Sequence, residues 1–480
     1  MYLIPEFFRT KPTEVLIGKG ILPDDLNDDS LGRVLDVLAE NDVSKIFSHV
    51  ALNAVKTYNI ATDHLHGDTT NMQVYGDYEK NGDLIAFGYP KHGRPDLKQF
   101  MLSLITTFDG AVPLFMKTLR GNTSDTTHFR DLITLIEKNV KDREEESYFT
   151  LDSAAYCEEN LKILNKVLII TRVPERISAV KEIKESYAHA LDQFDGNDNY
   201  KFAETCSIYG GVKQRWIIVY SRLAHEREDQ AIKALVQKEK IILEQALKKL
   251  ERRQFSCQLD AKNIVGDIAR QYKFHDIDIV DIVVENRFLS AGKPSKETPK
   301  ESYFMLKLAL KERTNHIEKQ IKLGSMFVLA TTQLDYEKLP TKAVLGEYKG
   351  QSPLENRFNL LKNATCISSK VYLKNENRIT ALAMIMCLSL LVYALAERQL
   401  RKSLVALNKT VPHQSKKQIQ NPTMKWIFKM FEGVGLVTVD LGSQITQEVT
   451  NLSSTLKDIL GHLGPECMDI YQIVPKGCGM

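Results

Sequence analysis

Eighteen consecutive residues without a charge, Ile379 to Ala396, set the strongest limit on how this 480-residue chain folds. A helix of this length can cross a membrane in a short span. The same pattern is typical of a helix that is buried on all sides within a large domain. Charged residues stand directly beside both ends, and the sequence has a single segment of this kind. We therefore expect a core helix, with a membrane-spanning helix as the alternative.

The composition is that of an ordinary globular protein, with 43% hydrophobic and 26% charged residues. A chain of this length holds about two to four domains. The net charge of +3 is too small to require a nucleic-acid partner, so any DNA-binding surface must be local. Seven cysteines without a CxxC pair favour a reducing compartment and argue against structural zinc. The first residues lack the features of a signal peptide, so we expect a cytoplasmic protein.

The order of predicted elements indicates an α/β fold with a mixed sheet flanked by helices. Residues 1–55 are predicted to be helical, with a helix starting at Asn27 to Ser30. Strands follow at 74–78, 100–108 and 112–119, the last two joined by a turn at Asp109-Gly110. Further elements are predicted as a helix with apolar residues Phe129, Leu132, Ile133 and Ile136, a strand at 148–151, a helix from about 158 and a strand at 167–173.

Residues from about 176 interrupt this order and indicate an insertion. They include a strand at 216–221, a long helix from about 226 to 253 and a polar linker at 293–300. A strand at about 326 then resumes the first pattern. The predicted parts are a helical N-terminal region at 1–55, a sheet domain in two parts at 56–175 and 323–405, a mostly helical insertion at 176–322 and a basic C-terminal region at 406–480.

Basic residues cluster between Arg398 and Met430, where eight lysines and arginines occur without an acid. A run this one-sided, with Trp426 and Phe428 inside it, suits a polyanion such as DNA. A solvated surface that keeps the protein soluble is the alternative. Lys416 and Lys417 are our candidate DNA contacts in this run.

Three carboxylates are candidates for one catalytic centre. Asp68 lies within or at the end of the first strand, Asp152 lies just past a later strand, and Glu355 lies in the segment YKGQSPLENRFNLLK. Three converging carboxylates repel one another unless cations neutralise them. Two Mg²⁺ ions about 3.5–4 Å apart, which Mn²⁺ can replace, would do so. Each acid also has a plain structural explanation, since Asp68 could cap a turn, Asp152 could cap a helix and Glu355 could close a capping box with Ser352.

The Glu355 segment carries a second pattern. Tyr348, Glu355 and Lys362 recur every seven residues, close to two helical turns, so all three would lie on one face of a continuous helix. Pro353 weakens that prediction, because its ring disfavours helical geometry in the preceding residue. The alternative is that Tyr348 precedes the helix.

Together these residues resemble bacterial insertion-sequence transposases that use an Asp-Asp-Glu triad on an RNase H-like fold. The resemblance rests on LNDDSLGRVLDVL (26–38), HGDTTNMQVYGDY (66–78), KHGRPDLKQFMLSL (91–104), LRGNTSD (119–125), LDSAAYCEENL (151–161), TRVPE (171–175), FVLATT (327–332) and the Glu355 segment. It implies that Asp68, Asp152 and Glu355 are catalytic and bind the metal. It also implies that Tyr348 and Lys362 hold phosphates of the transposon end. Gln351 stands where many members have arginine, which would replace a charged contact by a neutral one.

The resemblance implies a metal-dependent DNA transposase that cuts element ends and joins them to target DNA. Its partners would be double-stranded DNA and a second copy of the chain in a synaptic complex. A nuclease that cuts without joining and an inactive truncated relic that only binds DNA are the alternatives. The interval of 203 residues (355 − 152) between the last two acids exceeds what an RNase H-like core needs, which supports an insertion. Trp216, beside Lys213 and Arg215, is a candidate for stacking on a DNA base, with a core tryptophan as the alternative.

Overall fold

The computed structural model describes all of the chain except residues 1, 77, 79–82, 89–93, 125–126, 131, 134–146, 164–166, 192–197, 289–299, 363–370, 372, 443–444 and 472–480. The chain divides into two compact units. Unit 1 comprises Met1–Arg172, Ile208–Gln214 and Thr331–Met480, and unit 2 comprises Val173–Ser207 and Arg215–Ala330. Two parts of the predictions, Ile136 of the expected helix and residues 293–299 of the expected linker, lie outside the described residues.

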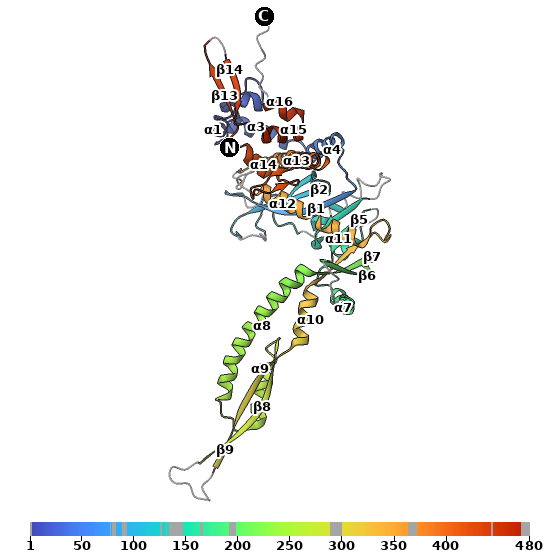
Figure 1. Cartoon of the computed structure of the whole chain (residues 1–480), viewed down its shortest axis with the longest axis vertical. Helices are drawn as coiled ribbons and strands as arrows, with labels where there is room; N and C mark the ends of the chain where they lie inside the picture. Colours follow the sequence, from blue (N-terminus) through green and yellow to red (C-terminus); the bar gives the residue numbers. More distant parts are fainter. Residues whose placement is uncertain are drawn as a thin grey trace. The chain divides into compact units, whose positions relative to one another are not determined.

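An eight-stranded mixed sheet has the strand order β3-β2-β1-β4-β5-β10-β7-β6. Its neighbouring strands β1 and β2 can be followed in Figure 1. Its strands are β1 (His64–Gln73), β2 (Gln99–Thr107), β3 (Pro113–Arg120), β4 (Tyr148–Leu151), β5 (Leu168–Arg172), β6 (Tyr200–Tyr209), β7 (Val212–Ser221) and β10 (Met326–Thr331). β1, β2 and β3 are antiparallel neighbours, whereas β4 runs parallel to β1 and β5 runs parallel to β4. This order of the first five strands confirms the predicted RNase H-like mixed sheet.

The first strand is β1, and it contains Asp68 as predicted. The strand predicted from residue 74 is not formed by the described residues there, because Val74 forms only an isolated bridge with Val371. β1 is central in the sheet, paired on one side with β2 and on the other with β4. Its polar residues Thr69, Thr70 and Asn71 are therefore buried, so the strand lacks the apolar alternation used to find strands.

Helices of unit 1 cover the sheet. The larger ones are α3 (Asp28–Ala39), α4 (Val43–Thr57), α11 (Thr341–Lys349), α12 (Ser352–Leu361), α13 (Glu376–Ala406), α14 (Met424–Phe431) and α15 (Ser454–Leu463). The predicted start of α3 is confirmed, because the Asn27 side chain caps the helix and accepts a hydrogen bond from the Ser30 backbone N–H at 2.9 Å. α4 and α13 pack on β3, α12 packs on β1 and α11 packs on β5.

The uncharged segment forms the middle of α13. Within the described residues, α13 is the one helix with the length and composition to cross a membrane. Cys387, Leu390 and Ala394 lie in a core with Phe47 of α4 and Leu104 of β2. Further along, α13 packs Leu400 and Leu404 against α14 and α15. A helix that supplies two cores in this way matches the expected core helix.

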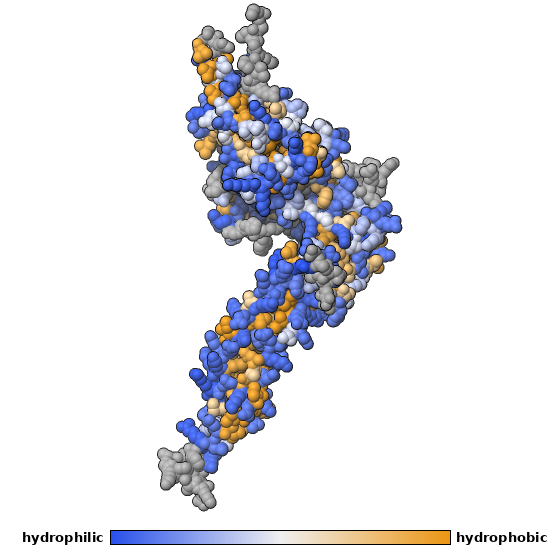
Figure 2. All heavy atoms as spheres, viewed as in Figure 1, coloured by the Kyte–Doolittle hydropathy of each residue, from blue (hydrophilic) through white to orange (hydrophobic). Residues whose placement is uncertain are grey.

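The rest of unit 1 is formed by short elements. They are α1 (Ile4–Phe8), α2 (Thr13–Leu16), α6 (Glu158–Leu161), β11 (Val411–Pro412), β12 (Gln418–Ile419), the hairpin of β13 (Gly435–Asp440) and β14 (Ile445–Thr450), and α16 (Pro465–Tyr471). The hairpin exposes apolar side chains, which form an orange stripe in Figure 2. Val437, Leu441 and Ile445 are among the exposed apolar residues of this hairpin and its connection.

Unit 2 contains the insertion. Its elements beyond the sheet are α7 (Ser178–Tyr187), α8 (Arg222–Glu251), α9 (Gln258–Ala269), β8 (His275–Phe288), β9 (Lys300–Glu312) and α10 (Thr314–Gly324). α8 is the predicted long helix, and it packs on α10 and β9. The long antiparallel pair β8 and β9 was not predicted. Opposite charges face each other across this pair at Asp276 and Lys311 and at Asp281 and Lys307, so charged residues interrupt the apolar pattern of the strands.

Candidate active site

Asp68 and Asp152 are neighbours on adjacent strands. Gly67 of β1 pairs with Leu151 of β4 in parallel register, so the next residue of each chain segment is an aspartate. Adjacent strands lie about 4.8 Å apart, which places the two aspartate backbones side by side. Each carboxylate is oriented by the residue after it. The Thr69 N–H donates to Asp68 Oδ1 at 2.7 Å, and the Ser153 N–H donates to Asp152 Oδ1 at 2.6 Å.

Both aspartates face the same side of the sheet. A Cβ added to Gly67 would lie 3.1 Å from Leu151 and 3.2 Å from Leu132, so these residues share the opposite face. Side chains alternate along a strand, and Asp68 and Asp152 therefore point to the other face. Met72, four residues after Asp68, belongs to the core that also contains Leu354 and Phe358 of α12. The aspartates consequently point to the face on which α12 packs.

Glu355 is exposed in the first turn of α12. The predicted capping box is wrong, because α12 starts at Ser352 with Gln351 as N-cap and without a side-chain capping bond. The predicted continuous helix is also wrong. Tyr348 lies on α11, and the chain turns at Gly350 before α12 begins. The alternative placement of Tyr348 before the helix is confirmed, since the preference of Ser352-Pro353 for a helix start outweighs the seven-residue pattern.

The charges of two of the acids nevertheless influence the pKa of Tyr348. Burial raises the pKa of Tyr348, and the negative charges of Asp152 and Glu355 act in the same direction. The positive charge of Arg172 acts against them. A tyrosine from α11 is thus within electrostatic reach of an acid that follows β4 and an acid on α12. Asp152 and Glu355 therefore both lie close enough to Tyr348 to influence its ionisation.

Arg172 is a site residue that the sequence analysis did not single out. Leu151 pairs with Thr171 of β5, so Arg172 stands beside Asp152 just as Asp152 stands beside Asp68. Three neighbouring strands therefore present an acid, an acid and an arginine in one row. The motif TRVPE contained the signal, but an arginine at a strand end is informative only when the neighbouring strand is known.

Lys362 and Gln351 lie at the two ends of α12. The Lys362 Nζ donates to Asn71 Oδ1 of β1 at 3.3 Å, which ties the end of the helix to the strand that carries Asp68. Asn71 also donates to Gln99 Oε1 at 3.1 Å. The Gln351 Nε2 is buried and has no hydrogen-bond partner among the described residues. The structure brings both residues to the helix of Glu355, and their contact with DNA stays a prediction.

The corner between α11 and α12 rests on two histidines of β1. The Glu347 carboxylate pairs with His64 at 3.0 Å. Burial alone would lower the pKa of His64, but the hydrogen bond and charge of Glu347 raise it above its ordinary value. Burial lowers the pKa of His66 to about 4, so this ring is neutral at physiological pH. A Cβ at Gly350 would lie 2.8 Å from His66 and 2.5 Å from Phe108, which makes the corner a place for glycine.

The proposed stacking role of Trp216 is inconsistent with its position. Trp216 is 1% exposed on β7, so its ring belongs to a core and cannot reach a base in this structure. Arg215 beside it is also buried and pairs with Glu204 at 3.3 Å. Lys213 is exposed. The strand pattern at 216–221 predicted the strand but not which face of it is covered.

The basic run between Arg398 and Met430 has fewer charges available to a ligand than its sequence suggests. Arg398 is buried and forms an ion pair with Asp109, and Arg401 pairs with Glu397 at 3.2 Å. Two of its eight charges therefore serve contacts inside unit 1. Lys416 and Lys417 are exposed on the turn between β11 and β12, where a polyanion could reach them. Their contact with DNA stays a prediction.

The acids supply the oxygen ligands that Mg²⁺ prefers, and the pair Asp68 and Asp152 has the required proximity. Glu355 does not complete a ligand set with them, because no group of three His, Cys, Asp or Glu residues is arranged to hold a metal within the described part of the chain. The pair fits a divalent cation, whereas the full triad is not assembled in this structure.

Comparison with known proteins gives three findings. Residues 1–52 match a family model described as "Domain of unknown function (DUF4277)". A search of curated proteins found no match. The solved structures that align include the cryo-EM structure of the piggyBac transposase synaptic complex with hairpin DNA, at 10% identity over 99% of this chain and 77% of that chain, with a TM-score of 0.34.

Two structures of Mos1 transposase align less extensively. The Mos1 mariner paired end complex with Mn has 16% identity over 32% of this chain and 50% of that chain, with a TM-score of 0.16. The Mos1 complex with the left transposon end has 18% identity over the same shares and a TM-score of 0.15. These scores are too low to assign the fold, which rests on the strand order and register described above.

Proposed function

We propose that this chain is a metal-dependent DNA transposase that cuts the ends of an insertion sequence and joins them to target DNA. The observation that carries the proposal is the arrangement around Tyr348. Asp152 and Glu355 both act on this tyrosine, and Asp68 is the neighbour of Asp152 across two parallel strands. We infer from this that three acids distant in sequence serve one site in unit 1. The sequence motifs that resemble insertion-sequence transposases support the same conclusion.

Each residue has a distinct role in the proposed reaction. Asp68 and Asp152 would hold a divalent cation, with Glu355 as the third acid, and bound Mg²⁺ or Mn²⁺ would neutralise negative charge on the phosphodiester oxygens. Tyr348 keeps its proton and would donate it in a hydrogen bond to a phosphate oxygen. Arg172 and Lys362 would pair with phosphates and fix the strand in position.

The reaction has two steps. Hydrolysis breaks a phosphodiester bond at the element end and leaves a 3′-hydroxyl group. That hydroxyl then attacks a phosphodiester of the target, so that one P–O bond forms as another breaks. We further propose two metal ions in each site, a dimer that holds two element ends in a synaptic complex, and a cytoplasmic location beside the bacterial chromosome.

A single incubation tests the function. Short donor DNA that carries the inverted repeats flanking the reading frame is mixed with the protein, Mg²⁺ and a supercoiled plasmid. We expect donor DNA joined to plasmid. Cleaved donor without joined product would identify a nuclease, and a shifted band without any chemistry would identify a DNA-binding relic. The matched control is Asp152→Asn in the same mixture, which keeps the shape of the side chain but removes its charge.

A further inference from the structure

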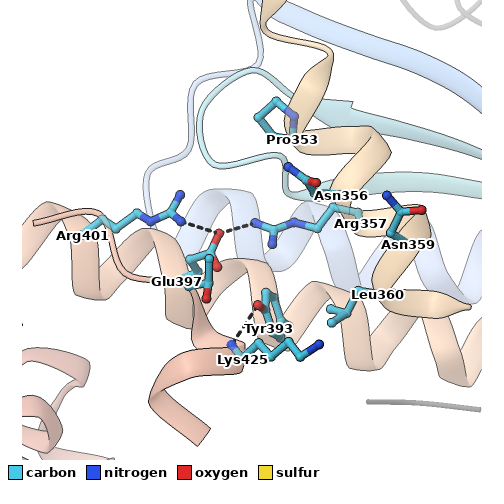
Figure 3. Close-up of a pocket in the computed structure, with 10 residues that line it drawn as sticks. Pro353, Asn356, Arg357, Asn359, Leu360, Tyr393, Glu397, Arg401 and Lys425 are labelled. Carbon is cyan, nitrogen blue, oxygen red and sulfur yellow. Dashed lines mark hydrogen bonds and ion pairs between the residues drawn. The ribbon is translucent and has the colours of Figure 1, made fainter. Parts of the chain in front are cut away.

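A polar pocket of about 330 Å³ lies beside α12, the helix of Glu355, and has no role in the proposed cleavage (Figure 3). It is formed by α12, α13 and α14 of unit 1. Its lining residues are Pro353, Asn356, Arg357, Asn359, Leu360, Tyr393, Glu397, Arg401, Thr423 and Lys425. We refer to it as the Lys425 pocket.

The single acid of the pocket is already neutralised. Glu397 is 4% exposed, and its Oε1 accepts from Arg357 at 3.0 Å and pairs with Arg401 at 3.2 Å, as Figure 3 shows. Its Oε2 accepts from the Met424 N–H at 3.0 Å. Arg357, Arg401 and Lys425 thus place three positive charges against one negative charge. The pocket therefore has an excess of positive charge that Glu397 does not cancel.

The donors left for a ligand are side chains and not the helix end. The first backbone N–H groups of α14 are used within the protein, since that of Met424 bonds to Glu397, that of Lys425 bonds to the Tyr393 hydroxyl at 3.0 Å and that of Trp426 bonds to Thr423. The Lys425 side chain is exposed and forms no ion pair with any residue that the structure describes. Asn356 and Asn359 are exposed on α12 and also line the pocket.

Glu355 does not line the pocket, but exposed asparagines of α12 lie between the two. Asn359 lies one helical turn after Glu355 and also one turn after Asn356, and residues three or four apart are neighbours on a helix surface. A polyanionic strand that reaches Glu355 would therefore pass these asparagines and approach Lys425. Amide and ammonium donors are the groups that bind a DNA backbone phosphate without reading its sequence.

We propose that the Lys425 pocket binds a backbone phosphate of the DNA strand that continues beyond the cleavage point. Lys425 supplies the charge, and Asn356 and Asn359 supply hydrogen bonds that position the phosphate. This inference rests on the proposed function, because it assumes that DNA lies at Glu355. It adds a contact that anchors the strand outside the catalytic centre.

The test is the salt dependence of DNA binding by the full chain. Affinity for a short mixed-sequence duplex is measured at several salt concentrations for the wild type, Lys425→Ala and Asn359→Asp. Each phosphate contact contributes about 0.9 to the slope of log affinity against log salt. We expect Lys425→Ala to lower that slope by about 1. Asn359→Asp should weaken binding several-fold, because it places a carboxylate where the phosphate would lie.

Two control variants carry the same chemical changes at exposed sites away from the pocket. Lys457→Ala on α15 and Asn53→Asp on α4 should keep the wild-type slope and affinity. Thermal melting checks that all four variants are folded. An unchanged slope in Lys425→Ala, or an equal decrease of the slope in Lys457→Ala, would show that the Lys425 pocket does not bind a phosphate. A wild type that binds DNA but never cuts it would refute the proposed function. The salt-dependence comparison would still show whether the Lys425 pocket binds a phosphate.

Discussion

At the residue scale, Tyr348 links the acids to the phosphate that the site is proposed to bind. Burial and the neighbouring carboxylates raise its pKa above the ordinary value of 10.0. The phenol therefore stays protonated and neutral through the physiological range. A neutral donor can approach both carboxylates and a phosphate without adding negative charge to the site.

Replacing Tyr348 by phenylalanine should slow DNA cleavage without unfolding the protein. The lost hydrogen bond to a charged phosphate oxygen is worth about 1.5–3 kcal/mol, which corresponds to roughly 10- to 100-fold in rate. Because the pKa is raised, the wild-type rate should show no decline due to Tyr348 below pH 10. Cleavage rates measured across that range check both statements. A variant as fast as the wild type would remove Tyr348 from the site.

Asp152→Asn should abolish strand cleavage and leave DNA binding largely intact. The substitution preserves volume and removes the negative charge that would hold the cation. Gel-shift titration and a cleavage assay on the same DNA measure the two properties separately. Normal cleavage at saturating protein together with weaker binding would argue that Asp152 contacts DNA and does not take part in catalysis.

The sequence motifs single out Asp68 and Asp152, which the structure places on neighbouring strands, but they say little about the surroundings of these acids. Asp68 and Asp152 could be named from motifs because aspartates beside strand residues and small neighbours form a recognisable pattern. Arg172 could not, because its role depends on the register between β4 and β5, which local sequence does not encode. The sequence left Trp216 open between a stacking residue and a core residue, and the structure confirms the core alternative.

At the element scale, the corner between α11 and α12 decides where Glu355 lies. His66 of β1 packs beneath this corner and is held neutral, with its pKa lowered to about 4 by burial. The pKa of His66 is lower in the folded protein than the unfolded value of 6.5. The neutral, buried ring is therefore fully compatible with the fold above pH 6.5. That compatibility is lost as the pH falls towards 4, because protonation then favours the unfolded chain.

The contribution of His66 should be measurable in the pH dependence of the unfolding free energy. Between pH 7 and about pH 4, the wild type should lose about 3 kcal/mol more stability than His66→Gln, whose amide does not titrate. Denaturant unfolding at a series of pH values measures the difference. His49→Gln on the exposed surface of α4 is the control and should follow the wild type. Parallel curves for wild type and His66→Gln would mean that the ring is not buried in solution.

The strand β7 gives a second prediction at this scale. Trp216→Phe should lower the thermal midpoint of unit 2, because it leaves a void around a side chain that is 1% exposed. Large-to-smaller changes in a core typically cost about 1–3 kcal/mol. DNA affinity should stay at the wild-type level. Unchanged stability with weaker binding would restore Trp216 as a stacking residue.

Elements with strong local signals were predicted well, and those defined by distant partners were not. α3 was found from its Asn27 cap and α8 from its long amphipathic pattern. The position of Asp68 in the first strand was predicted, but the extent of β1 was not, because its polar residues are buried between two strands. β8 and β9 were missed because cross-strand charge pairs interrupt the apolar alternation.

At the scale of the whole molecule, one strand order explains how acids far apart in sequence come together. β1 and β4 are adjacent and parallel although 84 residues separate Asp68 from Asp152 (152 − 68). α12 returns to β1 after the insertion and brings Glu355 to the same face. The sequence predicted this order through the succession of elements. The sequence suggested a metal site formed by three acids, whereas the residues that the structure describes include no group of three such ligands.

Binding of Mn²⁺ by the protein with a short DNA duplex would decide whether Asp68, Asp152 and Glu355 act together on divalent cations. Electron paramagnetic resonance would follow the titration for Asp152→Asn, Glu355→Gln and the double variant, with Asp458→Asn on α15 as control. We predict weaker binding in each single variant and a double variant whose loss is smaller than the sum, because both acids serve one site. Wild-type Mn²⁺ binding by Glu355→Gln, with additive losses in the double variant, would show that Glu355 and Asp152 do not serve a common metal site.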